Sequence, residues 1–325
     1  MERQEGKQMF IMDQDLKLNE WQFAQRKYLP YEAKVYLSRM RIRDWYESHD
    51  GDVYVSFSGG LDSTVLVDLV RKTVGKIPLI FVNTGLEYPE IISFVSRYDD
   101  VTVLKPRMSF RDVLRVCGYP LISKETASKI RKLRHGNLSE RYRNYLLHGD
   151  ERGNFGKLAE KWKFLIHAPF DISEECCTIM KKQPFAQYNR ETGRVPYIGI
   201  TQDEGFRRQR DYNKYGCNVY STDHPRSRPL GFWTRQDILR YISENRLHFC
   251  SIYGKIIFKN DIYQNTGVRR SGCVYCCMGC HLETRPNRFE RMKAENHSLY
   301  DYCMRPLYSG GLGFDYVLNY CGFVH

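Results

Sequence analysis

Six of the eleven cysteines lie in two short segments that could hold a metal ion. The first is the adjacent pair Cys176-Cys177, and the second contains Cys273, Cys276, Cys277 and Cys280. The two-residue gap between Cys273 and Cys276 lets two thiolates turn toward one metal ion. In a cytosolic chain of this size, clustered cysteines indicate a metal or redox site more often than a disulfide framework. The residues alone leave three alternatives: an iron-sulfur cluster, a zinc site on Cys273, Cys276, Cys280 and His281, or reduced core cysteines.

A second segment, Ser58 to Ser63, has the composition of an anion-binding loop. Gly59 and Gly60 let the backbone approach a ligand closely, and a helix beginning after them would aim its N-terminal dipole at a phosphate or sulfate. A Walker loop would need a Lys-Ser or Lys-Thr pair after the last glycine, and a Rossmann fingerprint would need three spaced glycines. Neither template fits, which leaves another kind of phosphate loop or a chance serine-glycine turn.

The formal net charge is +12, so the surface should attract polyanions or anionic nucleotides. The segment 129–163 carries ten Lys or Arg residues against four acidic ones, with Tyr142, Tyr145, Phe155 and Trp162 interleaved. This pattern suits stacking on unpaired nucleic-acid bases, or it is a solvated helical face with ordinary core aromatics. No apolar run approaches the roughly 18 residues of a membrane span, and no signal-peptide core precedes Gln14, so we expect a cytoplasmic protein without membrane contact.

The elements around the loop predict an α/β fold with a parallel sheet and helices on both faces. Residues 16–48 should form a helical arm with a break at Pro30. A strand from Val53 to Phe57, the glycine turn and a helix from Ser63 to Val74 follow. Further strands are predicted at Ile77–Val82 and Val101–Leu104, with a helix between them at Pro89–Arg97.

The rest of the chain is expected to be mainly helical. We predict a helix from Ser109 to about Leu165, strands at 195–200 and 218–221, and a helix at 235–245 capped by Thr234. Short helices are predicted at 287–295 and 299–304, and a packed terminal helix around Val317 and Leu318. We expect three parts: a helical arm (1–50), a nucleotide-binding domain (51–248), and a cysteine-rich segment with C-terminal helices (249–325).

The loop sequence Ser-Gly-Gly-Leu-Asp-Ser resembles the pyrophosphate loop of the adenine nucleotide alpha hydrolase, or PP-loop, superfamily. Over residues 50–285 the resemblance narrows to the phosphoadenylylsulfate (PAPS) reductase family. The segment 83–90 is similar to that family's second nucleotide loop, and 176–184 matches its CCxxRKxxP motif with Met180 in place of arginine. Residues 199–208 resemble GxRxDESxxR with Thr201 and Gly205 as departures, and 229–238 resembles a Pro-Leu, Trp-Thr, Asp-Ile run.

The resemblance implies a set of nucleotide-binding and catalytic residues. Asp62, Lys181 and Arg208 would be catalytic, and Lys182 and Arg207 would help to balance the nucleotide's charge, although each basic residue alone could equally belong to the surface. The nucleotide would be held by Ser58, Gly59, Gly60, Asp62, Ser63, Asn83, Thr84, Gly85 and Glu87.

The same resemblance, to adenylylsulfate reductases, implies a 4Fe-4S cluster. Its ligands would be Cys176, Cys177, Cys273 and Cys276; the family pattern does not require Cys277 or Cys280. Reductases of this family use a thiolate on a C-terminal ECGxH segment, whereas the tail here, from Asn319, lacks the glutamate and has a longer spacing after Cys321. The apolar and aromatic residues around Cys321 should bury it and raise its pKa.

These observations leave three functional classes. The chain could cleave ATP to adenylate an acceptor, with magnesium at Asp62 and cluster-assisted sulfur transfer, as in related DNA phosphorothioation and tRNA thiolation enzymes. It could instead reduce adenylylsulfate or phosphoadenylylsulfate through Cys321, or be a non-catalytic nucleotide-binding subunit. The tail and the basic stretch after Lys129 favour the first class. Its partners would be an adenine nucleotide, a nucleic acid, and a sulfur-donor protein such as a cysteine desulfurase or a thioredoxin-like protein.

Overall fold

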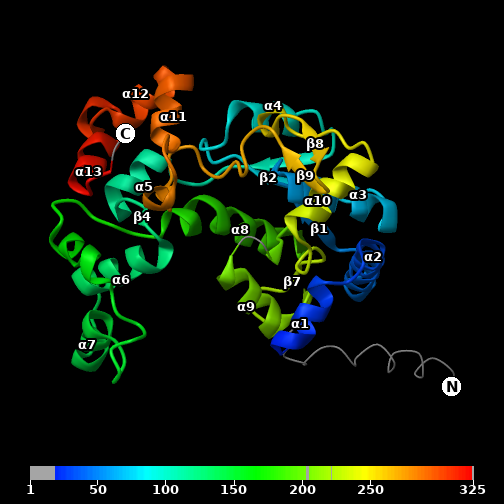
Figure 1. The fold of residues 1–325 in the computed structure, drawn as a ribbon, viewed down its shortest axis with the longest axis horizontal. Coiled ribbons are helices and arrows are strands. Elements are labelled where there is room, and N and C mark those ends of the chain that lie inside the picture. The colour runs from blue at the N-terminus through cyan, green and yellow to red at the C-terminus, as the bar shows by residue number, and fades with distance from the viewer. Residues whose placement is uncertain (1–18, 203–204, 221, 324–325) are drawn as a thin grey trace. The chain divides into compact units, whose positions relative to one another are not determined.

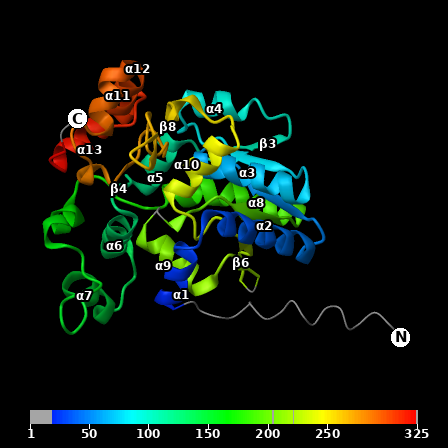
Figure 2. The ribbon, with the colours of Figure 1, turned by 45° about the vertical axis from the view of Figure 1, so that its right-hand side comes forward.

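The computed structural model describes residues 19–202, 205–220 and 222–323 (Figures 1 and 2). They form two compact units whose segments alternate along the chain. The first unit comprises the described residues of 1–83, 87–104 and 186–271, and the second those of 84–86, 105–185 and 272–325.

A six-stranded sheet forms the centre of the first unit, with the strand order β3-β2-β1-β5-β7-β6. Every pairing is parallel except that of β6 with β7. The expected α/β architecture with a mainly parallel sheet is therefore confirmed. The strands are β1 (Val53–Ser56), β2 (Leu79–Val82), β3 (Val101–Leu104), β5 (Val195–Ile198), β6 (Asn218–Val219) and β7 (Arg226–Ser227).

Helices cover both faces of this sheet, as the side chains of β1 show. Val53 and Val55 belong to the large core cluster, on the side where Tyr197 of β5 donates a hydrogen bond to the Ile42 carbonyl in α2 (Tyr31–Ser48). Tyr54 points the other way, since neighbouring strand residues face opposite sides. Its hydroxyl donates to Asn189 Oδ1 at 2.7 Å in α8 (Gln183–Thr192), which covers that second face.

The helices α4 (Pro89–Val95) and α10 (Arg235–Glu244) begin where the sequence predicted, α3 (Leu61–Val74) begins two residues earlier than expected, and α9 (Phe206–Tyr215) was not predicted. Pro30 separates α1 (Glu20–Lys27) from α2 and occupies the N-cap of α2. Thr234 caps α10 in a reciprocal capping box with Asp237. The remaining elements are the 3-10 turn η4 (Ser251–Tyr253) and the hairpin β8 (Ile256–Lys259) and β9 (Ile262–Asn265).

Four predicted strands are shorter than expected. The strand predicted at 53–57 ends at Ser56, and the one predicted at 77–82 begins only at Leu79. The strand expected at 195–200 ends at Ile198, and the one at 218–221 ends at Val219, with Ser221 outside the described residues. β5 meets β7 only through Tyr197 and Ser227, so no ladder partner extends the strand further.

The second unit is mainly helical. Its elements are α5 (Phe110–Cys117), α6 (Lys124–His135), α7 (Glu140–His148), the 3-10 helix η1 (Glu160–His167), the π-helical turn η2 (Thr178–Lys182), the 3-10 turns η5 (Cys280–Leu282) and η6 (Leu307–Ser309), α11 (Arg288–Glu295), α12 (His297–Met304) and α13 (Phe314–Tyr320). The terminal helix expected around Val317 is thus present, with Val317 and Leu318 buried.

The expected helix from Ser109 to Leu165 is instead divided into α5, α6, α7 and η1, which a two-residue strand and the non-helical segments 136–139 and 149–159 separate. β4 (Leu121–Ile122) pairs in parallel with β10 (Cys277–Met278), and Gly118 breaks the chain before it with φ +97°. A Cβ at Gly118 would lie 2.3 Å from the Asp171 backbone carbon, so only glycine fits there. Within the described part of the chain, no helix is long and apolar enough to cross a membrane.

Candidate functional site

The anion-binding loop connects β1 to α3 in the first unit, the arrangement that its sequence predicted. Gly59 has φ +70°, and a Cβ there would lie 3.0 Å from Val95 and 3.1 Å from Ile91, both in α4. Gly60 is the N-cap of α3. The first turn of a helix leaves its N–H groups without intrahelical partners, so the loop directs backbone donors and a positive dipole end toward a ligand.

Two serine hydroxyls meet inside this loop. The Oγ atoms of Ser58 and Ser63 are 3.1 Å apart, and Ser63 Oγ donates to the Gly60 carbonyl at 3.0 Å. Ser63 is buried and Ser58 is exposed. Both hydroxyls therefore hold the loop in shape, since Ser58 Oγ also accepts from the Gly60 N–H at 3.4 Å.

A basic residue that the sequence analysis missed, Arg235, lies beside Asp62 of the same loop. Arg235, at the start of α10, is half-buried, and its electrostatic neighbours are Asp62, Tyr253, Arg270 and Arg269. Burial is the main cause that lowers the pKa of Arg235, and Asp62 opposes that shift. Arg235 also donates to Asn265 Oδ1 at 2.8 Å. This group gives the loop the positive surroundings that a polyphosphate needs.

Tyr253 closes the loop from the side of η4. A Cβ at Gly60 would lie 3.5 Å from the Tyr253 hydroxyl, which donates to Ser271 Oγ at 3.0 Å. Burial raises the pKa of Tyr253, so its hydroxyl stays protonated and able to donate. No sequence motif pointed to Tyr253, because it becomes a neighbour of the loop only through the fold.

The predicted second loop begins at the end of β2. Asn83 donates its backbone N–H to the Leu104 carbonyl at 2.9 Å, and Glu87 is half-buried in the same unit. Thr84, Gly85 and Leu86 belong to the second unit, where Thr84 Oγ1 accepts from the Leu86 N–H at 3.2 Å. The Leu86 carbonyl accepts from the Val274 N–H at 2.9 Å, so this loop is tied directly to the cysteine segment.

The third predicted motif lies after β5. Thr201, in the position where the family has arginine, is buried, and Arg208 near the start of α9 is exposed. Asp203, Glu204 and the side chain of Arg207 lie outside the described residues. A buried threonine cannot replace the charge of an arginine.

The four predicted cluster ligands come together in the second unit. The hydrogen bond between the thiols of Cys176 and Cys177 is the main cause that raises the pKa of Cys176. Burial and the nearby Cys276 and Cys273 raise it further. The same hydrogen bond, followed by the charges of Lys124 and Lys181, lowers the pKa of Cys177. Lys181, a predicted catalytic residue, therefore lies beside the cysteines.

This cysteine centre, Cys176, Cys177, Cys273 and Cys276, offers the donor set of an iron-sulfur cluster or a zinc ion. The Cys276 N–H donates to the Cys273 carbonyl at 3.1 Å, which turns the two residues to one side. Across the described residues, no three His, Cys, Asp or Glu side chains are already arranged to hold a metal ion.

Cys277 and Cys280 have different surroundings from the centre. Cys277 is fully buried in β10, and burial, followed by Cys303, raises its pKa. Burial raises the pKa of Cys280 to about 11. Cys321 is also buried, in the turn that ends α13, and burial raises its pKa to about 12, which confirms the expectation for this residue.

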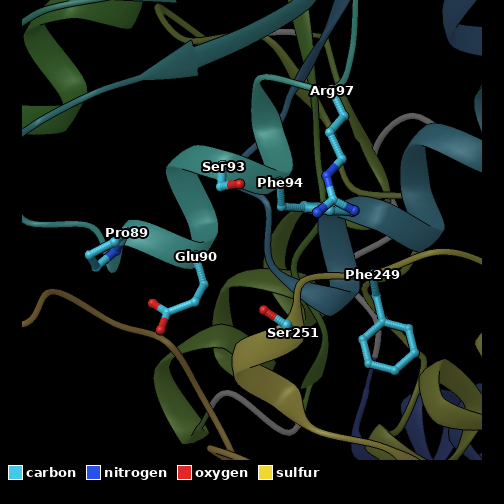
Figure 3. Close-up of a pocket in the computed structure, with 7 residues that line it drawn as sticks. All are labelled: Pro89, Glu90, Ser93, Phe94, Arg97, Phe249 and Ser251. Carbon is cyan, nitrogen blue, oxygen red and sulfur yellow. The ribbon is translucent and has the colours of Figure 1, made fainter. Parts of the chain in front are cut away.

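A separate pocket of about 310 Å³ lies in the first unit between α4 and the segment before η4. Figure 3 shows Glu90 on α4, Arg97 just after the end of that helix, and Phe249 and Ser251 on the other chain segment that lines the pocket. None of the predicted nucleotide-binding residues lines it. The pocket therefore does not identify the nucleotide site, which is open on the loop.

Comparison with known proteins gives a family match over most of the chain. The model of the phosphoadenosine phosphosulfate reductase domain matches residues 52–135 and 124–286. An adenosine 5'-phosphosulfate reductase of Bacillus pumilus is 24% identical over 223 residues, which cover 67% of this chain and 75% of the relative. An uncharacterized protein of Methanocaldococcus jannaschii is 25% identical over 236 residues, 72% of this chain, which spans only 38% of that longer relative.

Solved structures show distant likenesses. The phosphoadenylyl-sulfate reductase of Candida auris, in a phosphate complex, aligns with a TM-score of 0.39 and 16% identity over 72% of this chain and 90% of that one. The U34-tRNA thiolase NcsA of Methanococcus maripaludis, with its 4Fe-4S cluster, aligns with a TM-score of 0.34 and 14% identity over 89% of this chain and 80% of that one.

Proposed function

The chain belongs to the phosphoadenosine phosphosulfate reductase family, and from this premise we propose that it is an ATP pyrophosphatase that transfers sulfur. In this proposal the enzyme cleaves ATP between the α and β phosphates, adenylates an oxygen of an acceptor, and replaces that oxygen with sulfur. The acceptor is a nucleic acid, as the basic and aromatic segment 129–163 suggests.

The burial and raised pKa of Cys321 are the observations that favour this activity over reduction. A sulfonucleotide reductase needs a mobile thiolate that attacks the sulfate sulfur. Cys321 is the cysteine whose sequence surroundings most resemble that nucleophile, yet it is buried and its pKa is raised to about 12. At neutral pH it is a protonated thiol inside the terminal helix region, which argues against reduction through this residue.

The loop residues have clear roles in the first step. Backbone N–H groups at the start of α3, with Ser58, would hold the phosphates, and Arg235 would balance their charge. Asp62 would bind a magnesium ion, which would help to neutralise the phosphate charge. The acceptor oxygen attacks the α phosphorus, and the bond to the bridging oxygen breaks so that pyrophosphate leaves with its electron pair.

When the donor delivers hydrosulfide, the second step transfers sulfur without net oxidation or reduction. The sulfur attacks the atom that bears the adenylated oxygen, and AMP leaves with that oxygen. Cys176, Cys177, Cys273 and Cys276 would hold a 4Fe-4S cluster, which supplies a centre for sulfur in transit when it is bound. Lys181 and Lys124 would balance the negative charge of the Cys177 thiolate.

A second candidate is reduction of adenylylsulfate or phosphoadenylylsulfate to sulfite. It is favoured by the similarity to the adenosine 5'-phosphosulfate reductase of Bacillus pumilus. This candidate would need a nucleophilic cysteine other than buried Cys321, or an opening of α13 that exposes it.

One assay separates the candidates. Protein purified without oxygen is mixed with ATP, magnesium and sulfide, or with either sulfonucleotide and a thioredoxin, and pyrophosphate, AMP and sulfite are measured. We expect pyrophosphate and AMP from ATP when the acceptor is supplied, and no sulfite. Sulfite without pyrophosphate would replace the proposal with the reductase, and binding without either product would indicate a nucleotide-binding subunit.

A further inference from the structure

A pocket of about 450 Å³ in the second unit has the properties of a nucleobase site. Its walls come from the start of α6, from η1 and from the cysteine segment that follows β10. Its volume lies within the range of about 300–1,000 Å³ that is usual for small-ligand sites. The lining residues are Ile122, Ser123, Lys124, Thr126, Ala159, Trp162, Met278, Gly279, His281 and Leu282.

Aromatic rings form one side of this pocket. Trp162 and His281 meet edge to face with centroids 5.4 Å apart, and Phe323 lies 6.1 Å from Trp162 behind them. Trp162 is half-buried, so part of its ring is covered and part remains accessible. Planar, partly exposed rings of this kind stack on any nucleobase, because every base has an aromatic face.

Polar groups give the pocket hydrogen-bonding capacity. Lys124 is an exposed residue whose ammonium group also forms a hydrogen bond with Cys177, and the hydroxyls of Ser123 and Thr126, which form a hydrogen bond with each other at 2.9 Å, lie at the start of α6. His281 Nδ1 is buried without a hydrogen-bond partner among the described residues. An apolar site with an aromatic wall and a few donors and acceptors is the composition that recognises a heteroaromatic ring.

The flanking surface attracts a polyanion. Of the ten basic residues in 129–163, six make no ion pair among the described residues: Lys132, Arg141, Arg143, Arg152, Lys157 and Lys161. Lys161 lies over the Trp162 ring at 5.2 Å, and the exposed rings of Tyr142 and Tyr145 stack at 6.2 Å in α7, beside α6 (Figure 1). Phosphates along this surface would leave bases free to reach the pocket.

We propose that this pocket captures one unpaired base of a single-stranded nucleic acid, with Trp162 as its stacking platform. The pocket shares Lys124 with the cysteine centre, since Lys124 both lines it and attracts the Cys177 thiolate. A captured base would therefore lie next to the residues proposed to handle sulfur. The use of the base as the sulfur acceptor rests on the proposed function, whereas its capture does not.

The test uses hexanucleotides with the same charge and different bases. One carries a single central 2-aminopurine among abasic residues, the other is abasic throughout, and each is made as DNA and as RNA. The full chain is titrated without ATP, by fluorescence and by competition at fixed salt. The 2-aminopurine strand should bind about fivefold tighter or more, and its fluorescence should be quenched by stacking. The RNA and DNA arms identify the sugar that the site accepts.

Variants locate the base. Trp162→Ala should remove the preference for the 2-aminopurine strand, Trp162→Phe should keep most of it, and Trp21→Ala, an exposed tryptophan of the first unit, should leave it unchanged. Equal binding of the two strands by the wild type would overturn the proposal, as would a preference that survives Trp162→Ala. Binding of polyglutamate but not of the oligonucleotides would indicate an acidic protein partner instead.

The outcome is separable from that of the proposed function. Gly60→Val, which should lose ATP binding, should retain the base preference, because Gly60 and Trp162 lie in different units. If the wild type releases pyrophosphate but shows no base preference, base capture alone is overturned. Base capture without any ATP cleavage would overturn the proposed activity alone.

Discussion

The backbone of Ser63 approaches Gly199 so closely that a Cβ on Gly199 would lie 2.9 Å from Ser63 Cα. Gly199 follows β5 directly, and Ser63 is in the first turn of α3, so this contact sets how near the start of α3 comes to the end of β5. The first glycine of the third motif is therefore explained by packing against the anion-binding loop rather than by a contact with a ligand.

Gly199→Ala should destabilise the protein and weaken nucleotide binding together. The added methyl group meets backbone atoms of Asp62 and Ser63, which cannot move aside as a flexible side chain would. We expect a loss of about 1–3 kcal/mol in the free energy of unfolding, measured in urea. Gly60→Ala is the control, since its Cβ first meets the exposed Ser58 hydroxyl at 3.3 Å. Equal stability of the two variants would contradict this packing argument.

Gly60→Val should abolish nucleotide binding while the fold survives. The valine methyl groups would occupy the space between the hydroxyls of Ser58, Ser63 and Tyr253, where the loop would receive an anion. Isothermal calorimetry with ATP, adenylylsulfate and phosphoadenylylsulfate measures the loss, and circular dichroism checks the fold. Unchanged affinity for all three nucleotides in the folded variant would remove this loop from the site.

Arg235→Gln should weaken ATP binding by about 1.5–3 kcal/mol, the usual contribution of a hydrogen bond to a charged group. Arg235 is half-buried beside Asp62, Arg269 and Arg270, so its charge is only partly screened by water. Arg240→Gln is the matched control in the same helix, because Arg240 pairs with Glu32 and Glu244 instead. A similar loss of affinity in both variants would show that general surface charge, and not Arg235, holds the phosphates.

Protein purified without oxygen should be brown, with about four iron and four sulfide per chain, as a four-cysteine cluster requires. Cys273→Ser should bleach it, because one of the four proposed thiolate ligands is lost. Cys250→Ala, which removes a buried thiol from the first unit, should keep the colour and the iron. Stoichiometric zinc without iron, even after reconstitution with iron and sulfide, would show that the centre is a zinc site.

The sequence predicted the parts of the site that depend on local order. The β1 strand, the glycine turn and α3 are neighbours along the chain, so alternation and glycine spacing were enough to predict the loop. The strands β1 and β2 were predicted because each is a continuous apolar run, whereas β7 (Arg226–Ser227) is short and polar and was not predicted. The roles of the residues in this loop stay predictions until a nucleotide is bound.

What the sequence could not predict depends on distant contacts. Arg235 and Tyr253 reach the loop from α10 and η4, and only the fold brings them beside Asp62. The pairing of β4 with β10 joins two strands of two residues each, too short to show any periodicity. That pairing places the cysteine segment against the start of α6, and so builds the pocket around Trp162 that no motif indicated.

Cys321→Ser should leave turnover close to that of the wild type. The Cys321 side chain is buried, and its pKa of about 12 keeps it protonated at neutral pH, so it is not an effective nucleophile. Because the pKa is raised, the thiolate fraction of Cys321 is very small at pH 8, and it grows about tenfold per pH unit toward pH 12. Alkylation of Cys321 by iodoacetamide in the native protein should therefore be slow at pH 8 and accelerate as the pH rises.

The decisive measurement is a single turnover with sulfonucleotide labelled at the sulfate sulfur. A reductase would retain the label on the protein as a cysteine S-sulfonate, since its thiolate displaces the nucleotide from the sulfur. We expect no label at Cys321, with Cys303→Ser as the control for removing a buried thiol from the same unit. Label that is attached to Cys321 in the wild type and lost in Cys321→Ser would mean that α13 opens during turnover. The protein would then be a sulfonucleotide reductase whose nucleophile is released from a buried position.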